Sequence, residues 1–254
     1  MTLPKSPGFR LDGKRALVAG GSSGIGLAAA VALGEAGATV MVAARNADRL
    51  RAVVGQMVDA GLDATALPLD ITRIAETEAA VAAHGPFDVL LNAAGHAMHS
   101  PALDTSLADF DAVSAVNLRG AYFLTRAVAR GLIDAGKPGS LINITSQMAL
   151  VGGIDRAVYC ATKHAVEGFT KAMAIEWGQH GIRVNTIGPT FIRTPLNEPT
   201  FANPARVAWI KSKIKLGRVG VVTDMMGPVV YLASDAAALV TGSHLSVDGG
   251  WTAD

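Results

Sequence analysis

Short apolar runs alternate with longer amphipathic stretches along almost the whole chain, and glycine-rich or polar turns separate them. A short apolar run between turn signals is typical of a buried strand, whereas apolar positions recurring every three or four residues predict a helix. The pattern predicts strands at 15–19, 39–44, 65–69, 89–91, 140–145, 183–187 and 244–247, and helices at 24–36, 47–60, 72–83, 107–134, 157–179, 204–215 and 224–234.

This regular alternation indicates a parallel sheet, because right-handed crossovers place successive helices on both of its faces. We therefore expect an α/β fold, a single doubly wound, Rossmann-like domain with a seven-stranded parallel sheet over residues 1–254. The least regular segment, 189–204, contains four prolines. Long irregular segments are often functional, so we expect a lid at roughly residues 190–216.

Composition narrows the class of protein further. Half of the residues are hydrophobic and 17% are charged, which supplies a core and argues against disorder. The net charge is +1, and the basic residues of segment 211–218 spread around a helix, so we expect no nucleic-acid partner.

The cellular compartment is indicated by the cysteine content and by the length of the apolar runs. Cys160 is the sole cysteine, so an intrachain disulfide is impossible, which fits a reducing compartment. No apolar run has membrane-spanning length, and residues 1–13 lack the apolar core of a signal peptide. We therefore expect a cytoplasmic protein with no membrane partner.

A glycine-rich turn follows the first expected strand and leads into a helix. Glycine allows tight turns and close approach of a ligand, and the free N–H groups of a helix N-terminus favour a diphosphate. An ordinary tight turn would show similar glycines, but the position in the first βα unit favours a dinucleotide site. The candidate binding residues here are Gly20, Ser22, Ser23, Gly24, Ile25 and Gly26.

The end of the second expected strand indicates which dinucleotide is preferred. An acidic residue there would bind the ribose 2′-hydroxyl of NAD, whereas an arginine accommodates a 2′-phosphate. Arg45 ends this strand, and the nearest acid, Asp48, lies inside the next expected helix. A guanidinium matches phosphate geometry well. We therefore expect NADP(H) to be preferred, with NAD(H) possible.

Candidate proton-handling residues follow the fifth expected strand. Tyr159 and Lys163 are four apart on one expected helix and so share a face. An ammonium beside a tyrosine lowers its pKa, so Tyr159 could donate or accept a proton. Ser146 lies at the carboxyl end of a strand and could bind a substrate oxygen. Asn117 sits in an apolar helix, as either a functional residue or a satisfied core amide.

Taken together, these spaced motifs resemble the short-chain dehydrogenase/reductase family, in its short single-domain branch. The resemblance extends over about residues 11–253. It rests on the Gly20–Gly24–Gly26 turn, Asp70, the run Asn92-Ala93-Ala94-Gly95, Asn117, Ser146 and the pair Tyr159 and Lys163.

The resemblance implies an oxidoreductase that transfers a hydride between NADP(H) and a carbonyl/alcohol substrate, with Ser146, Tyr159, Lys163 and Asn117 as catalytic residues. Asn117 would hold a water that links Lys163 to solvent, and Lys163 would also bind the nicotinamide ribose. The family tends to form homotetramers. Its further cofactor contacts would be Asp70 and Ile71 at the adenine, Asn92 and Gly95 at the adenosine ribose, and Pro189, Ile192 and Thr194 at the nicotinamide.

Three positions depart from the family pattern. Ala19 and Ala93 replace the usual threonine and asparagine, and Thr190 replaces the glycine that usually follows the proline. None removes a group that carries the chemistry. The spacing between Tyr159 and Lys163 argues against an enoyl reductase, whose spacing in this superfamily is longer.

The substrate is left open by the sequence. Candidate contacts are His96, Met98, Gln147 and Arg156, and the substrate classes are a 3-oxoacyl thioester, a sugar or a sugar acid. His96 and His99 lack the further ligands of a metal site, so we expect no metal. The alternative function is a non-catalytic NADP(H) sensor on the same fold.

Overall fold

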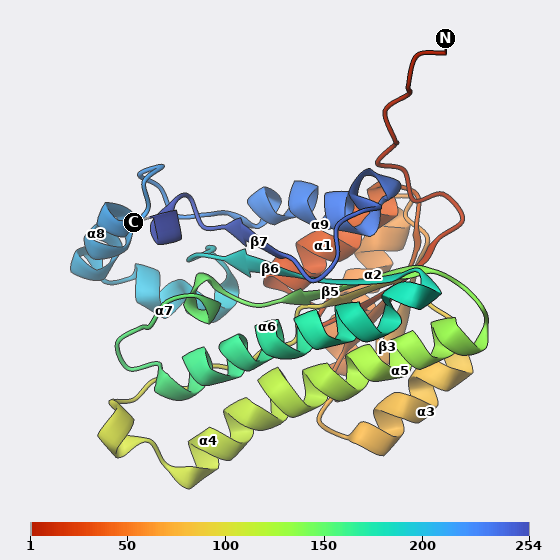
Figure 1. Cartoon of the computed structure of the whole chain (residues 1–254). Coiled ribbons are helices and arrows are strands. Elements are labelled where there is room, and N and C mark those ends of the chain that lie inside the picture. Colours follow the sequence, from red (N-terminus) through yellow and green to blue (C-terminus); the bar gives the residue numbers. More distant parts are fainter. Residues whose placement is uncertain (1, 254) are drawn as a thin grey trace.

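The computed structural model describes residues 2–253, apart from the side chains at positions 196 and 199 (Figure 1). Its centre is a seven-stranded parallel sheet with the strand order β3-β2-β1-β4-β5-β6-β7. The strands are β1 (Arg15–Ala19), β2 (Thr39–Ala44), β3 (Ala64–Pro68), β4 (Val89–Asn92), β5 (Gly139–Ile144), β6 (Ile182–Pro189) and β7 (His244–Val247).

Helices cover both faces of this sheet, as the βα alternation predicts (Figure 1). They are α1 (Gly24–Glu35), α2 (Ala47–Asp59), α3 (Ile74–His84), α4 (Leu107–Ser114), α5 (Ala121–Asp134), α6 (Ala157–Trp177), α7 (Glu198–Phe201), α8 (Pro204–Lys213) and α9 (Met226–Ala233). The predicted fold class is confirmed, and β1, β2 and β7 have the predicted bounds.

Two apolar clusters form the core, one on each face of the sheet. The first packs α1, α2 and α9 against the sheet through residues such as Leu33, Leu50 and Val229. The second packs α3, α5 and α6 on the other face through residues such as Leu124 and Met173. The central strands, such as β1, β4 and β5, are mostly buried on both faces, which is why they are continuous apolar runs.

The region 107–134, expected to form one or two helices, is three segments in the structure. Between α4 and α5, residues Ala115–Gly120 form a turn of π-helix. Such bulges often occur at functional sites, and this one contains Asn117. The irregular segment 189–204 also contains more helix than its prolines suggest, since α7 lies within it and α8 begins at its end.

Candidate active site

A cleft of about 510 Å³ lies at the carboxyl ends of the first strands. The strand order reverses between β1 and β4, and ligands of open α/β sheets bind at this switch point. Most of the predicted cofactor residues line the cleft, namely Gly20, Ser22, Ser23, Gly24, Ile25, Gly26, Arg45, Asp70, Ile71, Gly95 and Thr194.

The glycine turn has the shape that its sequence predicts. Gly20 has a φ of +76°, in the left-handed region that favours glycine. A Cβ on Gly26 would lie 2.2 Å from the carbonyl oxygen of Gly20, so only glycine allows α1 to pack on the turn. Within the described residues, the Ser23 side chain caps none of the first N–H groups of α1, and its first turn holds no acid. Those N–H groups can therefore bind an anion.

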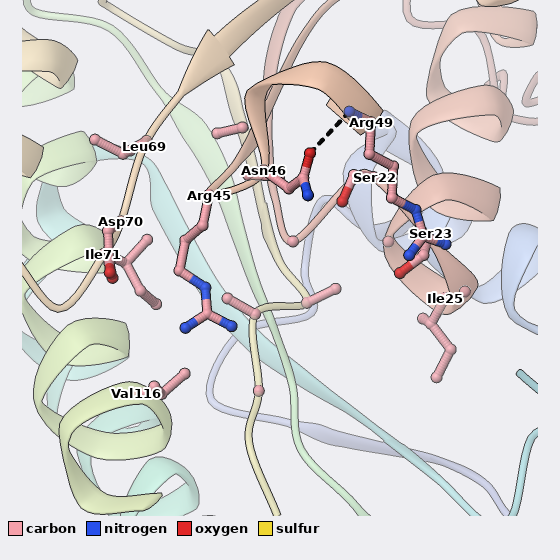
Figure 2. Close-up of a pocket in the computed structure, with 18 of the residues that line it drawn as sticks. Ser22, Ser23, Ile25, Arg45, Asn46, Arg49, Leu69, Asp70, Ile71 and Val116 are labelled. Carbon is pink, nitrogen blue, oxygen red and sulfur yellow. Dashed lines mark hydrogen bonds between the residues drawn. The ribbon is translucent and has the colours of Figure 1, made fainter. Parts of the chain in front are cut away.

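Two arginines lie at the side of the cleft formed by β2 and α2. Figure 2 shows the Arg45 guanidinium pointing into the space between the glycine turn and Asp70. Arg49 also lines the cleft, from the first turn of α2, where its backbone N–H donates to Asn46 Oδ1 (2.9 Å) (Figure 2). Asp48 does not line the cleft; its carboxylate pairs with Arg51 on the exposed side of α2. This edge is therefore strongly cationic.

Asp70 closes the opposite side of the cleft, after β3. Its carboxylate accepts hydrogen bonds from the backbone and side chain of Thr72 (2.9 and 2.8 Å). Burial acts to raise the pKa of Asp70, but these hydrogen bonds and the charges of Arg45 and Arg73 lower it on balance. Asp70 is therefore ionised at neutral pH and holds its place as a hydrogen-bond acceptor.

Asn92 lies deeper than the cleft. Its side chain is buried, donates to Asn143 Oδ1 (3.0 Å) and accepts from the backbone of Ala94 (3.2 Å). These bonds hold the Ala93–Gly95 turn, whose residues line the cleft. Asn92 thus shapes the wall through its neighbours, and its amide is already occupied by protein partners.

Ser146, Tyr159 and Lys163 gather at the carboxyl end of β5. Lys163, at 5% exposure, donates from Nζ to the carbonyl oxygen of Ile144 (2.9 Å), and this Nζ lies 5.7 Å from the Tyr159 ring centroid. Ser146 follows β5 in an extended conformation, accepts from the backbone of Met148 (3.1 Å), and lies close enough to the Tyr159 hydroxyl to act on its pKa. The hydroxyls of Ser146 and Tyr159 can therefore reach the same atom of a ligand.

Burial has the largest effect on the pKa values of Tyr159 and Lys163. It raises the pKa of Tyr159, against the lowering effects of the Ser146 hydrogen bond and the Arg156 charge. The prediction that the Tyr159 pKa is lowered by a neighbouring ammonium is wrong for this structure, because burial dominates. Burial also lowers the pKa of Lys163 to about 8, although the Glu167 carboxylate acts in the other direction.

Asn117 faces this group from the π-helical turn. Its Oδ1 accepts from the backbone of His96 (2.8 Å), and its Nδ2 donates to the His96 carbonyl (2.8 Å) and to Thr162 Oγ1 (3.3 Å). The side chain therefore joins the segment after β4 to α6, next to Tyr159. Its predicted role in a proton relay stays a prediction.

The segment after β6 forms another side of the cleft, where Thr194 lines it. The side-chain methyl of Thr194 lies 3.2 Å from the position of a Cβ on Gly24. Pro189 is buried at the end of β6, and Ile192 is buried in the core, where a β-bridge joins it to Gly220. Thr190 Oγ1 is buried and has no hydrogen-bond partner among the described residues, so it is available to a ligand.

The four predicted substrate contacts fall in different surroundings. His96 and the exposed Met98 follow β4, and Gln147 is buried beside Ser146, where its Oε1 lacks a partner within the described chain. Arg156 is half-buried at the start of α6 and donates to the His99 ring (2.7 Å). Among residues 2–253, no group of three or more His, Cys, Asp or Glu could hold a metal ion.

Sequence reasoning missed Arg49 and Val116 as cleft residues. Arg49 could have been found, because it lies four positions after Arg45, near the start of an expected helix, where the two side chains share a side. Val116 gave no signal, because its place depends on the π-helical turn.

Comparisons with known proteins agree with this geometry. Residues 19–252 match a family model described as enoyl-(acyl carrier protein) reductase. D-Erythrulose reductase of Gallus gallus is 40% identical, over 96% of this chain and 98% of its own. D-Threitol dehydrogenase of Mycolicibacterium smegmatis is 39% identical, over 96% of this chain and 95% of its own. The chain belongs to the short-chain dehydrogenase/reductase family.

A solved relative extends the likeness to the whole fold. It is an Agrobacterium tumefaciens protein provisionally described as a 2-deoxy-D-gluconate 3-dehydrogenase with bound NADP. This family member aligns with a TM-score of 0.93 and 40% identity, over 98% of this chain and 100% of that one. The family assignment makes the chain an oxidoreductase that acts on alcohol and carbonyl groups. Within residues 2–253, no helix has the length and apolar character to cross a bilayer.

Proposed function

We propose that this protein interconverts a secondary alcohol and a ketone on a small polyhydroxylated substrate, with NADP(H) as its cofactor. The observation that carries the proposal is the group formed by Tyr159 with the buried Ser146 and Lys163, beside a cleft whose edge holds Arg45. The named relatives act on a ketose, a polyol and a deoxy sugar acid, which favours sugars and sugar acids over 3-oxoacyl thioesters.

The roles of the residues follow from their positions. The Ser146 hydroxyl would donate to the substrate oxygen and stabilise the charge that develops on it. Tyr159 would donate its phenolic proton to that oxygen during reduction and remove it during oxidation. Lys163 would hold a positive charge close to Tyr159, which favours the phenolate left after proton transfer. When bound, NADP(H) supplies or accepts the hydride.

The cofactor fits the residues that are present. The glycine turn and the free N–H groups of α1 suit the diphosphate. The unpartnered hydroxyl of Thr190 lies after β6 and could bond to the nicotinamide carboxamide. Arg45 and Arg49 would hold the 2′-phosphate.

Arg45→Ala is therefore expected to weaken NADPH binding about 10- to 100-fold, because a charge-assisted hydrogen bond contributes roughly 1.5–3 kcal/mol. NADH binding should change less than about threefold, since NADH lacks the phosphate. Fluorescence titration with both cofactors measures this. The control is Arg51→Ala, which changes an exposed arginine of the following helix, α2, already paired with Asp48. Equal losses for NADPH and NADH would contradict phosphate recognition by Arg45.

Residues 190–216 would act as a lid over the substrate side of one catalytic domain spanning residues 1–254. This segment contains α7 and α8 and begins beside the glycine turn. It also brings Phe191 and Trp209 against Trp251 near the C-terminus.

A homotetramer is the expected assembly. Exposed apolar side chains occur on α4, α5 and α6, including Leu107 (76% exposed), Tyr122 (39%) and Ile175 (83%). Helix faces of this kind usually pack against a partner. Light scattering should give four times the mass of the chain; a monomer at micromolar concentration would rule the assembly out.

A cytoplasmic location fits the same function. The free thiol of Cys160 is the only one in the sequence, and it lies next to Tyr159. Such a thiol persists best in a reducing compartment. Cell fractionation would test the location, and recovery outside the cytoplasmic fraction would contradict it.

A further inference from the structure

Three basic side chains converge near Tyr159, from three separate segments. Arg156 immediately precedes α6, His99 follows β4 and Arg206 belongs to α8. The Arg156 guanidinium lies 2.7 Å from His99 Nε2, and its charge acts on Tyr159 and on Arg206. Figure 1 shows α7 and α8 at the same end of the molecule as the start of α6.

Aromatic rings surround these cations. The Arg156 guanidinium lies 5.7 Å from the ring centroid of Phe191, and that of Arg206 lies 4.5 Å from Trp209. Trp251 contacts both Phe191 and Trp209, with ring centroids 5.7 and 5.5 Å away. The rings orient the two guanidinium groups and exclude water from part of their surface.

The charges of this cluster are only partly offset among the described residues, by the Asp155 carboxylate, which acts on Arg156 and His99 without forming an ion pair. No ion pair found among residues 2–253 includes Arg156 or Arg206. By contrast, Arg193 and Arg218 of the same region pair with Glu198 and Asp224. A half-buried cation without a counter-ion costs free energy, which an anionic ligand would recover.

The protonation state of His99 narrows the class of ligand that this cluster would bind. Burial is the largest cause that lowers the pKa of His99, and the Arg156 charge adds to it, so His99 is neutral at pH 7. Its ring nitrogen can then accept from Arg156 and orient the guanidinium. One oriented arginine with a second nearby matches a carboxylate, which binds a guanidinium through two parallel hydrogen bonds.

We propose that Arg156, oriented by His99 and assisted by Arg206, binds the carboxylate of a sugar-acid substrate while Tyr159 acts on one of its hydroxyl carbons. The inference rests on the proposed function and deepens it. It assigns this enzyme to sugar acids rather than to neutral polyols and ketoses, a choice that the named relatives leave open.

Matched substrate pairs test the proposal directly. NADP⁺ reduction is followed with threonate against threitol, xylonate against xylitol, and gluconate against glucitol, since each pair differs mainly in a terminal carboxylate. In at least one pair the acid should show a kcat/KM about 30-fold or more above that of the polyol, the size expected for a charged hydrogen-bond pair. A phosphate ester of the polyol is assayed as a second anionic substrate, which distinguishes a carboxylate site from a phosphate site.

Variants of Arg156 test whether its side chain binds the carboxylate. Arg156→Gln should raise KM for the preferred acid about 30- to 100-fold and change kcat/KM for the polyol less than about threefold. For Arg156→Lys, the KM for the acid should lie between those of the wild type and Arg156→Gln, because lysine keeps the charge and loses the paired donors. Lys171→Gln removes a charge from an exposed position of α6, outside the lid, and should leave turnover of both substrates unaffected. NADPH titration of each variant verifies that it is folded.

The outcomes distinguish a failure of the carboxylate site from a failure of the proposed function. If the polyol or the phosphate ester is preferred in every pair, the carboxylate site is wrong, but the turnover observed still supports the proposed function. Equal losses of acid and polyol turnover in Arg156→Gln would also overturn the site, since Arg156 would then act only through Tyr159. If no acid, polyol or corresponding ketone turns over, both proposals fall.

Discussion

Tyr159→Phe lowers kcat about 10³- to 10⁴-fold and changes the Kd for NADPH less than about twofold. The phenol is the group placed to transfer a proton to the substrate oxygen, and general acid–base catalysis contributes up to about 10⁴-fold. The ring that packs at the start of α6 is unchanged, so the cleft should keep its shape. Stopped-flow kinetics with a sugar-acid or ketose substrate measures the loss.

The matched control for this change is Tyr122→Phe. Tyr122 lies on α5, where its ring packs edge-on against Phe123 and Phe169. Removing its hydroxyl should leave kcat within about twofold. A Tyr159→Phe enzyme with more than about a tenth of the wild-type rate would remove Tyr159 from the mechanism. Complete NADPH binding without turnover in the wild type would instead indicate a sensor of the cofactor.

The raised pKa of Tyr159 sets the direction of its pH dependence. Burial raises that pKa above its ordinary value of 10.0, so the phenol is protonated and ready to donate throughout the neutral range. Ketone reduction should therefore vary little around neutrality, whereas alcohol oxidation, which needs a proton acceptor, should accelerate as the pH rises. The opposite slopes would show that another group transfers the proton.

Lys163→Met should abolish most activity and yet stabilise the folded protein at pH 7. The pKa of Lys163 falls from 10.5 to about 8 on burial, which corresponds to a cost of about 3 kcal/mol for its charge. The variant loses the hydrogen bond to the Ile144 carbonyl, so the net gain in unfolding free energy is expected to be roughly 1–2 kcal/mol. We expect kcat to fall at least about 100-fold, because the charge beside Tyr159 is lost.

The sign of the pH dependence gives an independent check. Between pH 8 and 10.5 the unfolded wild-type chain holds the Lys163 proton and the folded chain has released it. Wild-type stability therefore gains from Lys163 as the pH rises through this window, and Lys163→Met lacks that gain. Urea unfolding at pH 7 and pH 9.5 should show the advantage of the variant shrinking. An advantage that does not change with pH would mean that the folded protein keeps the Lys163 proton up to pH 9.5, so that burial does not lower the pKa of Lys163.

Physical rules explain how the cofactor half of the site could be predicted in advance. Residues such as Gly20, Gly26 and Arg45 belong to one continuous βαβ segment, and local chain geometry places them at the switch point of the sheet. Arg49 follows the same local rule and could have been included. Asn92 could not be placed so easily, because its amide could bond either to a ligand or, as observed, to Asn143 on the neighbouring strand.

The sequence by itself determined the order of strands and helices and the nucleotide-binding turn. It also determined the spacing of Tyr159 and Lys163, because turn chemistry and helical periodicity are local properties. Only the tertiary structure decided the protonation of that pair, since burial, which is absent from the sequence pattern, outweighs the nearby charges at Tyr159. It also decided that Arg156, His99 and Arg206 meet, because residues up to about a hundred positions apart become neighbours only when the chain folds.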